Sequence, residues 1–315
     1  MNLVLVEHTD GAPTDVSLQA LALGARLGGE TQALLIGPGG TEAAGGLPVL
    51  SAHVAEHPSL DSFAPDAWAS IVCAAAERLG ATAVVAPGSA SATDVMARAA
   101  VRLDEPLAVN VTEVVPGSPL QLTRVRWGGS LLEEARLHGG VALLTVAPHT
   151  VAAVEPGAPG SVETFTPEVS EADLVVRVCD RVAPPAGGVS LADAKVVVTG
   201  GRGVGSAEGF APVEELAALL GGAVGCSRAV TMSGWRPHTD QVGQTGNKIA
   251  PEIYIACGVS GATQHIAGAK GAKRILAVNT DPEAPIMSVA DYAVIGDLHE
   301  VLPAVSAELR RRRGA

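Results

Sequence analysis

Polar residues between positions 227 and 297 are grouped into glycine-rich clusters, each beside an apolar, strand-like run. The clusters are Ser227-Arg228, Gln241-Val-Gly-Gln-Thr-Gly246 and Gly258-Val-Ser-Gly-Ala-Thr-Gln-His265, followed by Asn279 and Asp297. Glycines let backbone N–H groups approach a pyrophosphate closely, while a cation, an imidazole, hydroxyls and amides remain to bind a polar ring system. The pattern therefore favours a large redox cofactor that carries phosphates.

The segment that begins at Gly258 also resembles the turn that carries the nucleophile of many hydrolases. It is one residue short of the G-x-S-x-G pattern, and the sequence marks no acidic partner for a triad with His265. As a turn from a strand into a helix, it can instead present Ser260 and free helix N–H groups to phosphate oxygens. We therefore favour phosphate binding over hydrolysis.

Two further motifs suggest chemistry that their surroundings oppose. Residues 201–205 resemble a dinucleotide fingerprint, but the third glycine is not at the required offset and no acidic residue stands about twenty positions later. Arg202, at the tip of this loop, remains suited to an anion. The segment 53–57 matches the H-x-x-E-H pattern of some zinc peptidases, which requires a helix, whereas Pro58 pushes His57 out of the helical region. We expect neither a nicotinamide site nor a zinc site.

Three other side chains suit a flavin ring. A lone arginine such as Arg228 is ordinarily solvated or ion-paired. Beside a flavin it would matter more, because two unit charges about 4 Å apart at an effective dielectric near 20 interact by about 4 kcal/mol, more than a hundredfold in a redox equilibrium. Gln244 and Thr245 stand between two glycines and place an amide and a hydroxyl where a ring edge can lie, which suits a flavin N5.

These residues have to be positioned by strands that end at one edge of a sheet. The pattern predicts strands over residues 195–199, 252–257, 274–278 and 292–295, a helix over 213–220, and a short run at 223–227 that could be a further strand. Gly200, Gly258, Asn279 and Gly296 directly follow strand-like runs. Because ligands of doubly wound sheets bind outside the carboxyl ends of the strands, the polar residues should converge there.

The first half of the chain predicts β-α-β units followed by shorter strands. Strands are expected over 3–6, 33–36 and 83–86, with helices from Pro13 to the Gly28-Gly29 pair and over 66–79. Runs at 108–115, 120–127, 131–137 and 141–146 predict an antiparallel extension, and 174–178 one more strand. Residues 183–190 have the composition of a linker. We therefore expect two α/β domains, residues 1–188 and 189–315.

Composition limits the class of protein. Hydrophobic residues are 47% of the 315 residues and aromatic residues only 3%, which suits helices packed on a parallel sheet. The net charge of −12 argues against nucleic acid binding. The four cysteines show no C-x-x-C spacing, no basic leader precedes the first strand, and no apolar run approaches the ~20 residues of a membrane span. We expect an unprocessed cytoplasmic protein without direct membrane insertion.

Taken together, these motifs resemble the electron-transfer flavoprotein alpha subunit. The resemblance is carried by Gly200-Gly-Arg-Gly203, Ser227-Arg228-Ala229, Gln241 to Gly246, Ser260-Gly-Ala-Thr-Gln-His265, Asn279, Asp281-Pro-Glu-Ala-Pro285 and Asp297. It implies an N-terminal nucleotide-binding-like α/β domain and a C-terminal doubly wound parallel-sheet domain that binds FAD. The chain departs from the family at Thr280, where lysine is common, and at Thr263, where an aliphatic residue is usual.

The same resemblance implies one FAD per chain and a set of residues around it. Arg202, Ser260, Gly261 and Asn279 would surround the phosphates and ribityl chain, and Asp297 would lie toward the adenosine. Thr245 would bind N5, His265 the C2 carbonyl, and Arg228 would stabilise the anionic reduced ring. The full expected set is Arg202, Ser227, Arg228, Gln241, Val242, Gly243, Gln244, Thr245, Gly258, Ser260, Gly261, Ala262, Gln264, His265, Asn279, Asp297 and Leu298.

The resemblance further implies an electron carrier and not a substrate-transforming enzyme. Electrons would come from dehydrogenases, such as the acyl-CoA dehydrogenases of fatty acid β-oxidation, and pass to a quinone oxidoreductase or the respiratory chain. The chain would pair with a beta subunit that usually holds AMP, largely through the N-terminal domain. Two alternatives stay open: a bifurcating relative that draws electrons from NADH through a second FAD in the beta chain, and a flavin- or nucleotide-binding regulatory module.

Overall fold

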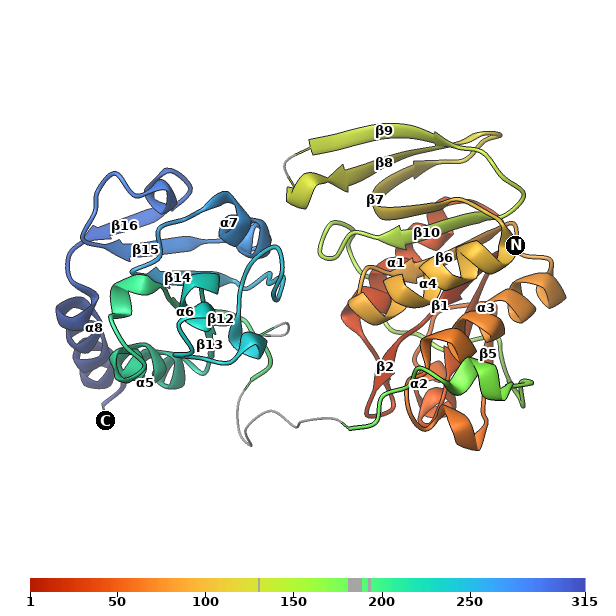
Figure 1. The fold of residues 1–315 in the computed structure, drawn as a ribbon, viewed down its shortest axis with the longest axis horizontal. Helices are drawn as coiled ribbons and strands as arrows, with labels where there is room; N and C mark the ends of the chain where they lie inside the picture. Colours follow the sequence, from red (N-terminus) through yellow and green to blue (C-terminus); the bar gives the residue numbers. More distant parts are fainter. Residues whose placement is uncertain (130, 181–188, 192–193, 315) are drawn as a thin grey trace. The chain divides into compact units, whose positions relative to one another are not determined.

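The computed structural model describes residues 1–129, 131–180, 189–191 and 194–314. The chain divides into two compact units, residues 1–182 and 183–315 (Figure 1). The predicted boundary after residue 188 adjoins the segment 181–188, which lies outside the described residues. Each unit is an α/β structure with its own sheet, and the predicted fold class is confirmed.

The first unit is built on a sheet that, in the described residues, has nine strands in the order β11-β5-β4-β1-β6-β10-β7-β8-β9. Neighbours from β11 to β7 are parallel, whereas β7, β8 and β9 are antiparallel. The strands are β1 (Asn2–Leu5), β4 (Thr31–Ile36), β5 (Ser51–Ala55), β6 (Ala83–Pro87), β7 (Leu107–Val115), β8 (Leu120–Arg126), β9 (Leu131–Leu137), β10 (Ala142–Val146) and β11 (Ser161–Phe165). A small hairpin joins β2 (His8–Thr9) to β3 (Ala12–Pro13).

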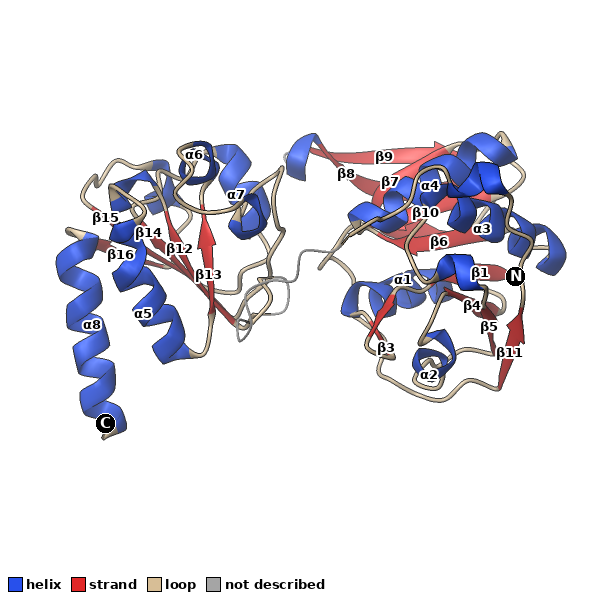
Figure 2. Ribbon diagram, turned by 60° about the horizontal axis from the view of Figure 1, so that its bottom comes forward, coloured by secondary structure: helices blue, strands red, loops and turns tan. Residues whose placement is uncertain are grey.

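Helices cover both faces of this sheet (Figure 2). They are α1 (Asp15–Arg26), α2 (Gly40–Ala44), α3 (Pro65–Leu79) and α4 (Ala90–Leu103). Side chains alternate along a strand, so Leu3 and Leu5 of β1 pack with α3 and α4, whereas Val4 and Val6 pack with α1 and α2 on the opposite face. Burial on both faces explains the continuous apolar runs of the parallel strands.

Two strand predictions in this unit are wrong, and both have a physical reason. The run at 141–146 does not extend the antiparallel part, because β10 inserts between β6 and β7 and is parallel to both. Its adjacent Leu143 and Leu144 are fully buried, which is typical of a strand covered on both faces. The run at 174–178 is not a strand, since its first residue, Leu174, ends the short 3-10 helix Glu171–Leu174, and Val175 and Val176 are exposed. The H-x-x-E-H segment is strand β5 and the turn after it, not a helix.

The second unit is a parallel sheet that, in the described residues, has five strands in the order β13-β12-β14-β15-β16. The strands are β12 (Val196–Gly200), β13 (Ala223–Cys226), β14 (Ile253–Cys257), β15 (Ile275–Asn279) and β16 (Tyr292–Ile295). The helices are α5 (Ala211–Leu220), α6 (Arg228–Met232), α7 (Thr263–Ala269) and α8 (Leu298–Arg313). The predicted strands and the doubly wound arrangement are confirmed.

The two faces of this sheet have separate cores. On one face Val198, Ile255 and Val278 pack with Phe210 and with residues of α5 and α8. On the other face Val197, Tyr254 and Ala277 pack with Ala269 of α7 and with the loops around it. Tyr254 therefore lies on the α7 side of β14, which matters for the site below. Every helix of the described residues falls short of the length and hydrophobicity that a membrane span requires.

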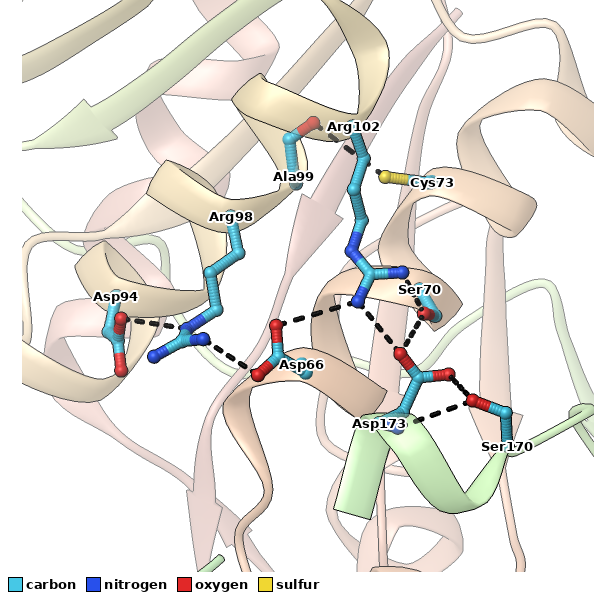
Figure 3. Close-up of polar contacts among 9 residues, drawn as sticks. All are labelled: Asp66, Ser70, Cys73, Asp94, Arg98, Ala99, Arg102, Ser170 and Asp173. Carbon is cyan, nitrogen blue, oxygen red and sulfur yellow. Dashed lines mark hydrogen bonds and ion pairs between the residues drawn. The ribbon is translucent and has the colours of Figure 1, made fainter. Parts of the chain in front are cut away.

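An ionic network ties the end of the first unit to its helices (Figure 3). Asp173, in the 3-10 helix Glu171–Leu174, accepts hydrogen bonds from Arg102 of α4 at 2.7 Å, from Ser70 of α3 at 3.1 Å and from Ser170 at 2.7 Å. Burial opposes ionisation, but these three bonds outweigh it and keep the pKa of the Asp173 carboxyl below its usual value. The carboxylate therefore stabilises the fold at neutral pH.

Replacing this carboxylate should destabilise the first unit in a pH-dependent way. At pH 7 we expect Asp173→Asn to cost about 1.5–3 kcal/mol, the range for hydrogen bonds to charged groups. The folded-state pKa is lowered, so the contribution exists above the unfolded pKa and is lost as pH falls through the folded value. Urea unfolding at pH 7 and pH 3, with the exposed Asp180→Asn as the control, checks this. A deficit that persists undiminished at pH 3 would contradict the assignment to charge.

Candidate cofactor site

A pocket of about 470 Å³ opens at the carboxyl ends of β12, β13, β14 and β15. It lies within the second unit, at the edge where the sequence places the polar clusters. The predicted residues that line it are Arg202, Ser227, Arg228, Gln241, Val242, Gly243, Gln244, Thr245, Gly258, Ser260, Ala262, Gln264, His265 and Asn279. The sheet thus brings together segments that are up to 77 residues apart in the chain, from Arg202 to Asn279.

Three predicted residues lie outside the lining of this pocket. Asp297 precedes α8, and its side chain accepts a hydrogen bond of 2.9 Å from the backbone N–H of His299, so it caps that helix. Leu298 is buried in the core between α5 and α8. Gly261 has a φ of +82°, and a Cβ there would lie 2.2 Å from the backbone nitrogen of Ile286. Their roles toward a cofactor remain predictions.

The pocket also has lining residues that the predicted set does not contain. These are Gly203, Ala229, Val259, Asp281 and Ala284. All of them lie in or beside motifs that carry the resemblance, so their positions in the sequence were a usable signal. Asp281 is held in a turn next to the predicted residue Asn279. Its carboxylate accepts a hydrogen bond from the backbone N–H of Glu283 at 2.9 Å, and its own backbone N–H donates to Oδ1 of Asn279 at 3.1 Å.

The floor of the pocket is formed by two backbone segments in direct contact. The N–H of Gly203, after β12, donates to the carbonyl of Gly258, after β14, at 3.0 Å. Gly258 has a φ of +63°, and a Cβ there would lie 2.7 Å from the Cα of Gly203. Only glycine combines this conformation with such a close approach. Because the two loops pack directly against each other, neither of these positions places a side chain in the pocket.

A chain of side-chain hydrogen bonds fixes the hydroxyl of Thr245. The hydroxyl of Thr231 lies 2.8 Å from Oε1 of Gln241 and 2.9 Å from the backbone carbonyl of Arg228, and its one hydrogen is shared between these two acceptors. Nε2 of Gln241 donates to Oγ1 of Thr245 at 3.0 Å. Gln241 is buried and therefore held in place. Because the Thr245 oxygen accepts from Gln241, its own hydrogen remains for an acceptor in the pocket. A ring nitrogen with a lone pair is such an acceptor.

His265 is the buried titratable group of the pocket. Its Nε2 lies 2.6 Å from the hydroxyl of Tyr254, while its buried Nδ1 has no hydrogen-bond partner among the described residues. Burial lowers the pKa of His265 to about 4, against an opposing contribution from the backbone of Val242. The imidazole is therefore neutral at pH 7 and has one donor and one acceptor nitrogen.

The charges of the pocket are mainly positive. Arg202 and Arg228 both line it, and neither forms an ion pair with a residue that the structure describes. Asp281 is the acidic residue of the lining. The hydroxyl of Ser227 makes no capping bond to α6 and is not used by that helix. Two uncompensated guanidiniums with nearby hydroxyls suit an anionic ligand such as a pyrophosphate.

Comparison with known proteins agrees with this geometry. The family model of the electron transfer flavoprotein domain matches residues 2–172, and that of the electron transfer flavoprotein FAD-binding domain matches residues 190–270. The electron transfer flavoprotein subunit alpha of Mycobacterium leprae is 40% identical over 99% of both chains. The chain belongs to the electron transfer flavoprotein alpha-subunit family. The subunit alpha of Bacillus subtilis is 35% identical over 98% of this chain and 97% of its own length.

Membership of the electron transfer flavoprotein family confirms the resemblance that the motifs indicated. A relative from Caenorhabditis elegans, the probable electron transfer flavoprotein subunit alpha, mitochondrial, is 35% identical over 98% of this chain and 93% of its own length. The match to the FAD-binding domain extends from β12 to α7 and so contains most of the pocket lining. The part of the chain that matches the FAD-binding domain is therefore the part that forms most of the pocket.

The close contact between Gly258 and Gly203 can be tested with alanine. We expect Gly258→Ala to destabilise the second unit by about 2–4 kcal/mol, because it adds a steric clash to the cost of a left-handed φ, itself about 1–2 kcal/mol. Gly221→Ala is the matched control, since Gly221 has a φ of +65° with nothing within 4 Å of its Cβ position. Urea unfolding of both variants separates the two costs. Equal losses would show that the loops do not need to touch.

Proposed function

We propose that this chain binds one FAD in the pocket of the second unit and carries electrons as the alpha subunit of a heterodimer. The single observation that carries the proposal is the pocket itself. It combines two arginines that form no ion pair with the described residues, a hydroxyl held by Gln241 and a buried neutral histidine, inside a domain that matches an FAD-binding family. When bound, FAD supplies reversible one- and two-electron transfer. We assign FAD binding to residues 189–315.

The phosphate-bearing part of FAD is assigned to the loops after β12, β14 and β15. Arg202 supplies a charge suited to phosphate oxygens, and Ser260 and Asn279 supply hydrogen-bonding groups on neighbouring loops. The glycine contact at the pocket floor supports this assignment, because it leaves room for backbone and phosphate to approach. We assign Gly261 to the turn that holds this loop, and Asp297 to the adenosine end.

The ring of FAD is assigned to the segments around α6 and α7. Thr245 donates its hydroxyl hydrogen to N5, His265 faces the C2 carbonyl, and Arg228 supplies the positive charge that reduction of the ring calls for. None of these groups has to accept or release a proton for electron transfer. His265 supports this assignment, since its lowered pKa keeps it neutral across the physiological range.

The partners follow from the family and from the division of the chain. We propose that residues 1–188 form much of the interface with a beta subunit that holds AMP. Dehydrogenases, acyl-CoA dehydrogenases among them, deliver electrons, and a quinone oxidoreductase or an equivalent acceptor of the respiratory chain removes them. The alpha-subunit relatives, which match nearly the whole chain, support this role of a redox carrier. We place the complex in the cytoplasm.

Cofactor content tests the proposal directly. We expect the chain, coexpressed with its beta subunit and purified, to show the visible absorption of an oxidised flavin. Extraction should return FAD, and not FMN, at one equivalent per alpha chain. The beta subunit purified alone serves as the control for flavin that it holds itself. A colourless heterodimer that stays colourless after incubation with FAD would refute the proposed function.

Loss of the arginine charge should make the bound flavin harder to reduce. We expect Arg228→Ala to lower the reduction potential by the equivalent of about 1–4 kcal/mol, where the upper value is the ceiling for charges about 4 Å apart and solvent exposure of Arg228 reduces it. Anionic reduced flavin should be lost in the same variant. Spectroelectrochemical titration measures both quantities, and Arg312→Ala, an exposed arginine at the end of α8, is the control. Identical potentials in the two variants would exclude Arg228.

A further inference from the structure

Asn247 closes the base of the loop that carries Gln244 and Thr245. This loop, residues 239–247, has both of these residues near its tip, where they are exposed and line the pocket. Asn247 itself is not part of the pocket lining. It can therefore act on a ligand only through the loop that it closes.

The side-chain amide of Asn247 joins the two ends of the loop. Its Nδ2 lies 2.6 Å from the backbone oxygen of Thr239 and 3.2 Å from that of Gln241. Backbone oxygens only accept hydrogen bonds, so the atom that faces both of them has to be the NH2 donor. Turning the amide would instead bring three oxygen atoms together. The bond to Thr239 reaches the 3-10 helix His238–Asp240, at which the loop begins.

The backbone of Asn247 adds a second set of bonds to the same closure. Its N–H donates to the oxygen of Gln241 at 2.7 Å, and its carbonyl accepts from the N–H of Gly243 at 3.2 Å. Gly246 allows the chain to return this closely, because a Cβ there would clash with the Gln241 oxygen. The end of the loop is thus bonded to its beginning through both main chain and side chain.

We propose that Asn247 is a positioning residue of the cofactor site, whose amide closes the 239–247 loop and so holds Gln244 and Thr245 in place before a ligand arrives. Side chains at the tip of an open loop would have to be ordered on binding, which lowers affinity. A loop that is already closed avoids this cost. The inference rests on the proposed FAD site, but its first test does not require FAD.

Asn247→Asp removes the two donors with almost no change of shape. At neutral pH a carboxylate oxygen would face the oxygens of Thr239 and Gln241 with no hydrogen between them, so the loop should open. A side chain that only fills space would tolerate this replacement. Lys248→Gln is the matched control, because Lys248 is exposed, lies outside the pocket lining and changes the net charge by the same amount. Asn247→Ala, which adds no charge, is the second variant if the aspartate folds poorly.

The first test is amide hydrogen exchange in the full chain without FAD. We expect the N–H groups of Gly243 and Gly246, which are bonded within the loop, to exchange about tenfold faster in Asn247→Asp, the equivalent of roughly one hydrogen bond. The N–H of Tyr254, in the core strand β14, should change less. Lys248→Gln should match the wild type throughout. Unchanged loop amides, or equal acceleration at Tyr254, would overturn the inference.

The second test measures the FAD dissociation constant of the heterodimer. At pH 8 we expect it to rise about tenfold in Asn247→Asp and to stay at the wild-type value in Lys248→Gln. The ratio of the aspartate variant to the wild type should fall as the pH is lowered to about 5. The two backbone oxygens raise the pKa of this carboxyl, and its protonated form recovers one donor. A ratio that does not change with pH would contradict the role of the donors.

The two proposals can fail separately. If the wild-type heterodimer binds no FAD, the proposed function fails while the exchange result still stands. If FAD binds equally well to Asn247→Asp and Lys248→Gln at pH 8, the inference fails and the proposed function remains.

Discussion

Contact between two backbone segments at the carboxyl edge of the second sheet is the constraint on which the site depends. Gly203 and Gly258 touch through a hydrogen bond of 3.0 Å, and neither position has room for a side chain. The loops that follow β12 and β14 are therefore held flat against each other. Arg202 and Ser260 lie on these two loops, and one added carbon atom at either glycine would force the loops apart.

The polar groups around the pocket are divided by burial into two kinds with different physical roles. Arg202 and Arg228 line the pocket without ion pairs in the described residues, so their charge is available to a ligand. Gln241 and His265 are buried, and hydrogen bonds to Thr245 and Tyr254 hold them in defined orientations. The arginines supply positive electrostatic potential, and the buried side chains supply hydrogen-bonding groups of fixed orientation. A carrier that passes electrons without moving substrate atoms needs both, and it needs no group that titrates near neutral pH.

Much of the fold could be predicted, and the errors are instructive. Four strands of the second sheet, β12, β14, β15 and β16, are predictable because each is a short apolar run that ends in glycine or asparagine or is followed directly by glycine. The sequence predicts β10 in the antiparallel part of the sheet, and this is wrong, because an apolar run looks the same beside an antiparallel or a parallel neighbour. The pattern also predicts a strand over residues 174–178, where Val175 and Val176 are exposed, because periodicity alone does not separate exposed valines from buried ones.

The sequence by itself determined the family, the two α/β units and most of the pocket lining, because glycine, arginine, glutamine and histidine in fixed spacing carry chemical information that does not depend on contacts. Only the tertiary structure decided what each side chain is bonded to. It placed Asp297 as a helix cap and Leu298 in a core, and it put the phenol of Tyr254 behind His265. Tyr254 reads as one more core residue of an apolar strand. Its partner lies in a helix eleven residues later, and the packing of α7 on the sheet is what brings the two together.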